Sequence, residues 1–186
     1  LALTNLITLL VYGLPIGGVL ATRDAVIPYA VGVDIACRMK MTVLDLPLAW
    51  LDEAPDRLTA AIERETRFGV GATFKTRRQH PVMDADWRVT RTTATLKDRA
   101  WAQLGTSGSG NHFVEFGRLV VTNREVGLEP GAYLALLSHS GSRGSGAQIA
   151  QHYSTLAKRL HPELPPHLAQ LAWLDLGTEA GQEYWA

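Results

Sequence analysis

Two runs rich in glycine and serine lie in the middle of the chain: residues 105–115 read GTSGSGNHFVE and residues 138–146 read SHSGSRGSG. Alternating apolar residues at 112–116, 119–123 and 133–138 predict strands that lead from the first run to the second. Glycine lets the backbone approach a ligand closely, and a histidine can ligate a metal, transfer a proton or attack phosphorus. Either run alone is equally typical of a surface turn, but the two together indicate a functional site.

Outward from this centre, the pattern predicts both strands and helices. Residues 13–22 are typical of a glycine-rich turn entering a strand, and residues 41–46 alternate like a half-buried strand. Helices are predicted at 49–67, 96–104 and 148–160, with one or two more turns at 168–174, and 73–95 is expected to be a long loop or small insert. This mixture without regular alternation predicts an α+β fold, with mixed β-sheets flanked by helices.

Composition sets broad limits on the class of protein. The chain has 186 residues, of which 46% are hydrophobic and 19% charged, and its formal net charge is zero, so its overall charge argues neither for nor against nucleic acid. The single cysteine excludes an intrachain disulfide and fits a reducing compartment, so we expect a cytoplasmic protein. The apolar residues 1–12 are too short to span a bilayer and predict a buried strand or helix, and no membrane partner is expected.

Four side chains from separate parts of the chain offer a mixed donor set. Asp34 and Cys37 lie three residues apart, and His112 and His139 come from the two glycine-rich runs. Oxygen, sulfur and nitrogen donors together suit Mn²⁺, Zn²⁺ or Fe²⁺, and a thiolate could bridge two ions. The alternative for Cys37 is a small core residue, the commoner role of a lone cysteine.

Three further polar residues suit a phosphate or nucleotide ligand. Arg143 lies four residues after His139, just before a predicted helix whose N-terminal amides would favour a dianion, although it could equally anchor the loop. Asn111 and Glu115 flank His112 and could hold a nucleotide. The other histidines are expected to be surface or helix residues: His80, His152, His161 and His167.

Basic residues are concentrated between residues 75 and 99. Seven of them occur there against three acidic residues. A solvated face is the simpler interpretation, and a patch for a phosphate chain is the alternative.

The motifs together resemble those of the RtcB family of RNA ligases. The similar segments are residues 13–21, 31–39, 104–115 and 138–146, they occur in the family's order, and the resemblance runs from Tyr12 to about Trp185. The resemblance implies the amino-terminal part of a single RtcB-like catalytic domain occupying residues 1–186. The family's further metal-binding histidine and its guanylylated histidine are not expected within this sequence.

The resemblance also implies an activity and its cofactors. Such a ligase depends on GTP and two Mn²⁺ ions and joins RNA 2′,3′-cyclic phosphate or 3′-phosphate ends to 5′-hydroxyl ends, in tRNA splicing or RNA repair. The RNA 3′-phosphate is activated with GMP carried on a histidine, and an archease-type activator protein is a conceivable partner.

The resemblance gives each candidate residue a role. Asp34, Cys37, His112 and His139 match metal ligands, with Cys37 between the two ions. Asn111 and Glu115 match residues that contact the nucleotide, and Cys37 and Arg143 match catalytic positions, Arg143 near the RNA phosphate.

The sequence departs from the family pattern in the lead-in before the first glycine-rich turn, where residues 6–12 replace the family's acidic and histidine residues, and in the motif that contains Asp34 and Cys37. Asp-Ile-Gly-Cys-Gly-Met is usual, whereas Ala36 and Arg38 replace the two glycines here, which indicates a divergent subgroup. Two other functions are compatible with the same residues: a non-catalytic module that binds RNA ends or metal, and a metal-dependent phosphodiesterase that opens cyclic phosphates.

Overall fold

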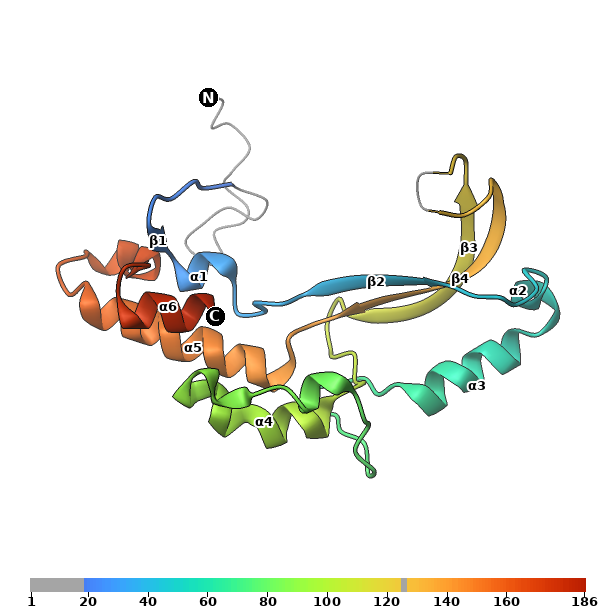
Figure 1. Ribbon diagram of the computed structural model, residues 1–186, viewed down its shortest axis with the longest axis horizontal. Coiled ribbons are helices and arrows are strands. Elements are labelled where there is room, and N and C mark those ends of the chain that lie inside the picture. Colours follow the sequence, from blue (N-terminus) through green and yellow to red (C-terminus); the bar gives the residue numbers. More distant parts are fainter. Residues whose placement is uncertain (1–18, 125–126) are drawn as a thin grey trace. The chain divides into compact units, whose positions relative to one another are not determined.

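The computed structural model describes residues 19–124 and 127–186 (Figure 1). The strand or helix predicted for residues 1–12, and most of the turn predicted at 13–22, lie outside the described residues. Helices and strands are mixed and all strand pairs among the described residues are antiparallel, so the predicted α+β class is confirmed. The contacts divide the described residues into two compact units, one comprising 19–35, 84–98 and 144–186, and the other 36–83, 99–124 and 127–143.

The unit formed by residues 36–83 and 99–143 is built on a three-stranded sheet in the order β2-β4-β3. The strands are β2 (Arg38–Val43), β3 (Phe113–Val121) and β4 (Gly131–Ser140). The central strand β4 carries the buried Leu134, which is 0% exposed. Burial of this side chain contributes to the stability of the sheet.

The strand boundaries differ from those predicted. β2 begins three residues before the predicted 41–46, and the two strands expected at 112–116 and 119–123 are one strand, β3. The glycine that interrupts the alternation, Gly117, pairs with Ala135, so the ladder continues through it. β4 extends beyond the predicted 133–138 to Ser140, which puts His139 in the strand rather than in a loop.

Several helix boundaries also differ from those predicted. The helix predicted at 49–67 is two helices, α2 (Trp50–Glu53) and α3 (Pro55–Glu65), because Pro55 excludes the helical conformation from the residue before it. The segment 73–95 is not a loop throughout: it contains η1 (Pro81–Met83), η2 (Trp87–Val89) and the start of α4 (Arg91–Gln103).

A reciprocal cap explains why α4 starts before the predicted residue 96. The amide of Thr93 donates to the hydroxyl of Thr90 at 3.0 Å, and the amide of Thr90 donates to the hydroxyl of Thr93 at 3.1 Å. This arrangement satisfies two backbone donors in the way a capping box does. Threonine in place of the usual glutamate or glutamine made the signal easy to miss in the sequence.

The other unit is mainly helical. It contains α1 (Pro28–Val31), nearly all of α5 (Arg143–Leu160), η3 (Pro166–Leu171) and α6 (Glu179–Trp185), and a short pair of strands, β1 (Ala25–Val26) and β5 (Leu174–Asp175). Its core is Tyr153, Ala157, Ala172 and Leu174. α5 starts at Arg143, five residues before the prediction, and the turns predicted at 168–174 are a 3₁₀ helix followed by β5.

Candidate metal centre

Three potential metal ligands converge in the sheet-containing unit. The ligand atoms of Cys37, His112 and His139 all lie within 4.8 Å of one another. The Sγ atom of Cys37 is 2.6 Å from Nε2 of His139 and 3.7 Å from Nε2 of His112. The two imidazole rings meet edge to face, with their centroids 5.4 Å apart.

The register of the sheet explains this convergence. His139 on the central strand lies opposite Met39 of β2 on one side and Phe113 of β3 on the other. Cys37 directly precedes β2 and His112 directly precedes β3, so both lie at the end of the sheet where β4 finishes. Residues distant in sequence therefore meet because their strands are neighbours.

Ser107 joins the two glycine-rich runs to each other. Its side chain is 2% exposed, and its hydroxyl donates to the carbonyl of His139 at 3.1 Å. Its own carbonyl accepts from the amide of Gly141 at 3.3 Å and from the guanidinium of Arg143. The first run is thereby fixed against the end of β4, beside the three ligands.

Gly108 is required where the first run passes the site. Its φ is +132°, and a Cβ atom there would lie 2.6 Å from Nδ1 of His112 and collide with the guanidinium of Arg143. Residues with a side chain rarely adopt this conformation. Glycine thus allows the backbone, the imidazole and the guanidinium to be close together.

The donor geometry fits a metal ion after a small adjustment. Sulfur and nitrogen atoms bound to one tetrahedral ion at about 2.3 and 2.1 Å stand about 3.6 Å apart. The 3.7 Å between Cys37 and His112 meets this value. The Sγ atom of Cys37 and Nε2 of His139 lie 2.6 Å apart, so this distance would have to increase by about 1 Å. One thiolate and two imidazoles alone suit Zn²⁺ better than Mn²⁺, for which an added carboxylate is the usual requirement.

The other predicted site residues do not belong to the group of three converging ligands. Asp34 belongs to the other compact unit, in the bend between α1 and β2, and is not one of the three converging ligands. Asn111 and Glu115 are exposed, in the turn before β3 and on β3 itself. Arg143 has a φ of +56°, rare for a residue other than glycine, and binds the carbonyl of Ser107, as the loop-anchor interpretation predicts.

Three of the four remaining histidines are surface residues, as predicted. His80, His152 and His167 are exposed. His161 has a structural role that the sequence did not reveal. Its ring stacks on Trp173 with 3.7 Å between centroids, and its nitrogens lie 2.9 Å from Oε1 of Glu163 and 3.1 Å from the carbonyl of Trp173.

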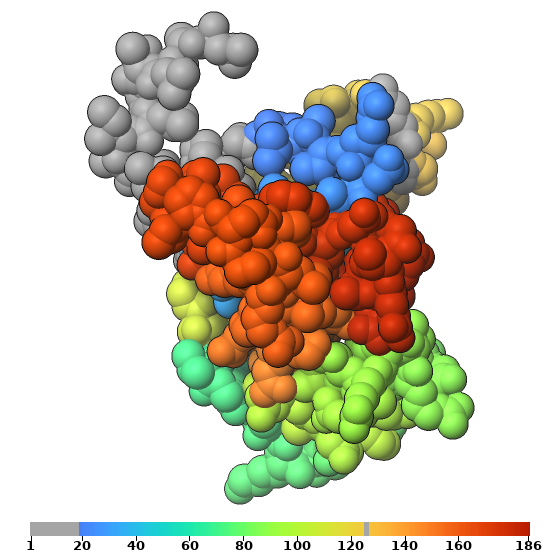
Figure 2. Space-filling model, turned by 90° about the vertical axis from the view of Figure 1, so that its left-hand side faces the viewer, coloured from blue at the N-terminus to red at the C-terminus, as the bar shows by residue number. Residues whose placement is uncertain are grey.

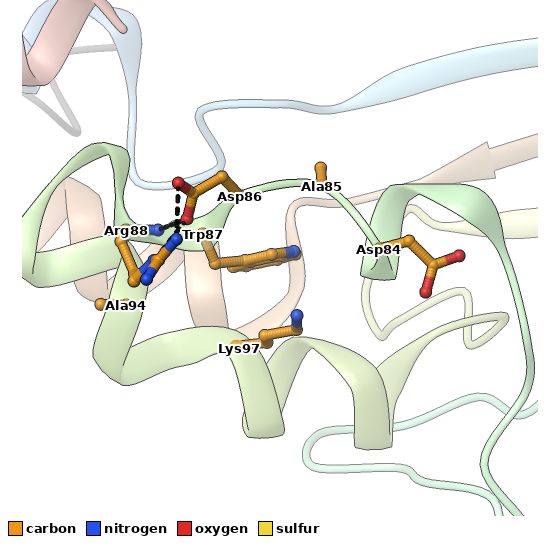
Figure 3. Close-up of a pocket in the computed structure, with 7 residues that line it drawn as sticks. All are labelled: Asp84, Ala85, Asp86, Trp87, Arg88, Ala94 and Lys97. Atoms are coloured by element: carbon orange, nitrogen blue, oxygen red, sulfur yellow. Dashed lines mark hydrogen bonds and ion pairs between the residues drawn. The ribbon is translucent and has the colours of Figure 1, made fainter.

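Ion pairs neutralise part of the basic segment 75–99. Arg88 lies 2.9 Å from Asp86, and its guanidinium holds the pKa of that carboxyl below the ordinary value of 3.8. Figure 3 shows this pair at a hollow of about 400 Å³, where Trp87, Lys97 and Asp84 are also exposed to the cavity. Two carboxylates and two cations line the hollow, so its charges balance and it has no excess of positive charge to attract phosphate.

No helix in the described part of the chain has both the length and the apolar character needed to cross a bilayer.

Comparison with known proteins connects these features to one family. A family model described as tRNA-splicing ligase RtcB matches residues 9–95 and 83–186. The RNA-splicing ligase RtcB1 of Escherichia coli ATCC 25922 is 31% identical over 190 residues, which cover 92% of this chain and 44% of the relative. The tRNA-splicing ligase RtcB of Nanoarchaeum equitans is 31% identical over 189 residues, covering 80% of this chain and 39% of the relative. The tRNA-splicing ligase RtcB of Thermococcus kodakarensis is 26% identical over 214 residues, which cover 94% of this chain and 44% of the relative.

The chain therefore spans less than half the length of the curated relatives it matches. The family match nevertheless extends over nearly all of its residues, including every position of the converging Cys37, His112 and His139 group. On these findings the chain belongs to the RtcB family.

Proposed function

We propose that the protein is a metal- and GTP-dependent RNA ligase that joins 2′,3′-cyclic phosphate or 3′-phosphate ends to 5′-hydroxyl ends. The observation that carries this proposal is the convergence of Cys37, His112 and His139 within 4.8 Å. The relatives are named RNA-splicing and tRNA-splicing ligases, which supports the same proposal. The grouping of a thiolate and two imidazoles at one end of the sheet supports the proposal independently of sequence similarity.

The proposed roles follow from the chemistry of each side chain. Cys37, His112 and His139 would hold Mn²⁺, and we propose that the carboxylate of Asp34 completes the set and favours Mn²⁺ over Zn²⁺. Bound metal would supply charge neutralisation at phosphorus and lower the pKa of a coordinated hydroxyl.

The nucleotide and the RNA would be held by neighbouring polar groups. Asn111 and Glu115 offer an amide and a carboxylate for the GTP base or ribose, and Arg143 offers a guanidinium for the RNA phosphate. Among the described residues, His112 and His139 are the only histidines in the group of three converging ligands. We therefore propose that the histidine that carries GMP lies in a part of the protein outside these 186 residues, as the partial coverage of the relatives allows.

Metal binding can be measured without activity. We expect the wild-type protein to bind Mn²⁺ by isothermal titration calorimetry, and His139→Gln to weaken that binding more than about tenfold, since loss of a ligand costs at least as much as loss of its supporting hydrogen bonds. His167→Gln is the matched control, because His167 is exposed and outside the group. Equal affinities for the two variants would refute the metal site.

The reaction itself distinguishes the alternatives. The complete protein should join an RNA ending in 3′-phosphate to one beginning with 5′-hydroxyl, only when GTP and Mn²⁺ are present, and Cys37→Ser should abolish joining. Release of 3′-phosphate from a cyclic phosphate without joining would indicate the phosphodiesterase. Metal-dependent binding of RNA ends without any product would indicate the non-catalytic module.

A further inference from the structure

One face of α5 is polar, exposed and free of negative charge. Along the helix the buried positions are Gly146, Ala150, Tyr153 and Ala157. The opposite side presents exposed residues over three turns: Gln148, Gln151, His152, Thr155 and Arg159. None of the 18 residues of α5 is Asp or Glu, so this face has only neutral donors and positive charge.

Two adjoining hollows follow this face. One, of about 370 Å³, is lined by residues of α5 alone, among them His152 and Arg159. The other, of about 410 Å³, is lined by Gln148 and His152 together with Arg91 and Thr95 of α4 and Glu183 of α6. Because both share Gln148 and His152, they form a single groove, and all its residues belong to the same compact unit. Figure 2 shows α5, in orange, with α6, in red, at its side.

The groove has two positive ends that other residues do not neutralise. Among the described residues, neither Arg91 nor Arg159 has an ion-pair or hydrogen-bond partner, in contrast to Arg88, which pairs with Asp86. The one carboxylate in the lining, Glu183, accepts a hydrogen bond from the hydroxyl of Tyr153 at 3.2 Å. The net charge of the groove is therefore positive.

We propose that this groove binds the sugar-phosphate backbone of a single RNA strand. The twelve residues from Gln148 to Arg159 span about 16 Å along the helix, enough for several nucleotides rather than one phosphate ion. Arginine, glutamine and threonine are the side chains that commonly contact phosphate and sugar oxygens. The backbone is the common feature of all RNA sequences, so binding here is independent of sequence. The choice of RNA over other polyanions rests on the proposed function.

The test measures binding of RNA that cannot react. A fluorescent single-stranded 12-mer with a 3′-hydroxyl end is titrated with the protein in EDTA and without GTP, and anisotropy is followed at several salt concentrations. The variant Arg91→Gln/Arg159→Gln removes both unpaired cations. We expect its affinity to fall roughly 25-fold at 0.1 M salt and the slope of log K against log salt to flatten by about 1.4, since each single-strand phosphate contact contributes about 0.7.

A matched control separates the groove from overall charge. Arg88→Gln/Arg124→Gln removes the same charge from arginines that are paired with Asp86 and Glu129. We expect it to bind RNA within about twofold of wild type, because neither guanidinium lines the groove. A thermal melt of each variant checks folding, which substitution of exposed side chains should leave unchanged.

Three results would overturn the proposal. The first is that the wild-type protein does not bind the 12-mer. The second is that the two double variants lose RNA affinity equally. The third is that polyglutamate binds as tightly as RNA and depends on Arg91 and Arg159, which would assign the groove to an acidic polypeptide. Because metal, GTP and a reactive RNA end are absent, a negative result here leaves the ligase proposal unaffected. Failure of ligation or of Mn²⁺ binding likewise leaves this measurement unaffected.

Discussion

At the scale of single residues, the candidate centre depends on close contacts that few side chains would permit. Ser107 holds the first glycine-rich run through the carbonyl of His139, the amide of Gly141 and the guanidinium of Arg143. Gly108 then passes next to His112 and Arg143. Neither residue carries reactive chemistry. Their contribution is to fix the positions of residues that do, which is why the run is rich in small residues.

Gly108→Ala should disrupt this arrangement. Its φ of +132° and the collision of the new Cβ with Arg143 both oppose the substitution. We expect the free energy of unfolding, measured by urea denaturation, to fall by about 1–3 kcal/mol. We also expect Mn²⁺ affinity to fall, because the Cβ would lie 2.6 Å from Nδ1 of His112.

Gly117→Ala is the control for this prediction. Gly117 lies in β3 with an ordinary negative φ, and a Cβ atom there would have no heavy atom within 4 Å. Removal of the flexibility of glycine in a strand should leave stability unchanged or slightly higher. Equal destabilisation by the two substitutions would mean that Gly108 has no special steric role.

The residues of the site were easier to predict than their arrangement. His112, His139 and Cys37 were identifiable because few residue types bind metal and each stands in an unusual local context. The sequence allowed a loop-anchor role for Arg143 but did not identify its partner, the carbonyl of Ser107, because this contact depends on how β3 and β4 place the two runs side by side.

At the scale of the elements, α5 has a different role on each face. Its buried face packs Tyr153 into the helical core, where the side chain is 1% exposed, its hydroxyl donates to Glu183 and its ring lies 5.2 Å from that of Tyr184. Desolvation by burial raises the pKa of Tyr153 above the ordinary value of 10.0, and burial does the same to Tyr184.

These raised pKa values predict a loss of stability in alkaline solution. Between the unfolded and folded pKa values of a tyrosine, the unfolded chain releases a proton that the folded chain retains, so stability is complete below the unfolded value and falls as pH rises. We expect the free energy of unfolding to decline above about pH 10. The fall should be smaller in Tyr153→Phe, which has no proton to lose at this position.

Measurement of urea unfolding at pH 7 and pH 11 tests this expectation. At pH 7, Tyr153→Phe should lose about 1 kcal/mol with the hydrogen bond to Glu183. Tyr133→Phe is the control, because the hydroxyl of Tyr133 bonds to the carbonyl of Glu129 in an exposed setting. An unchanged pH dependence in Tyr153→Phe would show that the buried hydroxyl does not control alkaline unfolding.

Sequence patterns were sufficient to predict the longer helices and strands but not their boundaries. Long periodic stretches such as α5 and β4 were predicted in kind and approximate position, because burial of one face imposes the period. Boundaries depended on single residues: Pro55 divided α2 from α3, and the Thr90–Thr93 cap moved the start of α4. Such local contacts compete with periodicity and are difficult to weigh without the structure.

At the scale of the whole chain, each of the two compact units has a core of its own. Leu134 lies in the sheet-containing unit and Leu174 in the helical unit, and both are 0% exposed. The prediction of a single catalytic domain stays a prediction, since two units can form parts of one domain. Because their cores are separate, the two units could open independently of each other.

Leu134→Ala and Leu174→Ala provide a matched pair of tests for this separation. Each substitution removes the same buried atoms and should reduce stability by about 2–5 kcal/mol. In native-state hydrogen exchange we expect Leu174→Ala to accelerate exchange of the amides of α5, α6 and β5, and Leu134→Ala to accelerate those of β3 and β4. Acceleration of all amides by each variant would show a single cooperative unit. In that case the candidate metal centre would depend on the helical core as strongly as on its own sheet, and a change distant from Cys37 would impair metal binding through global stability.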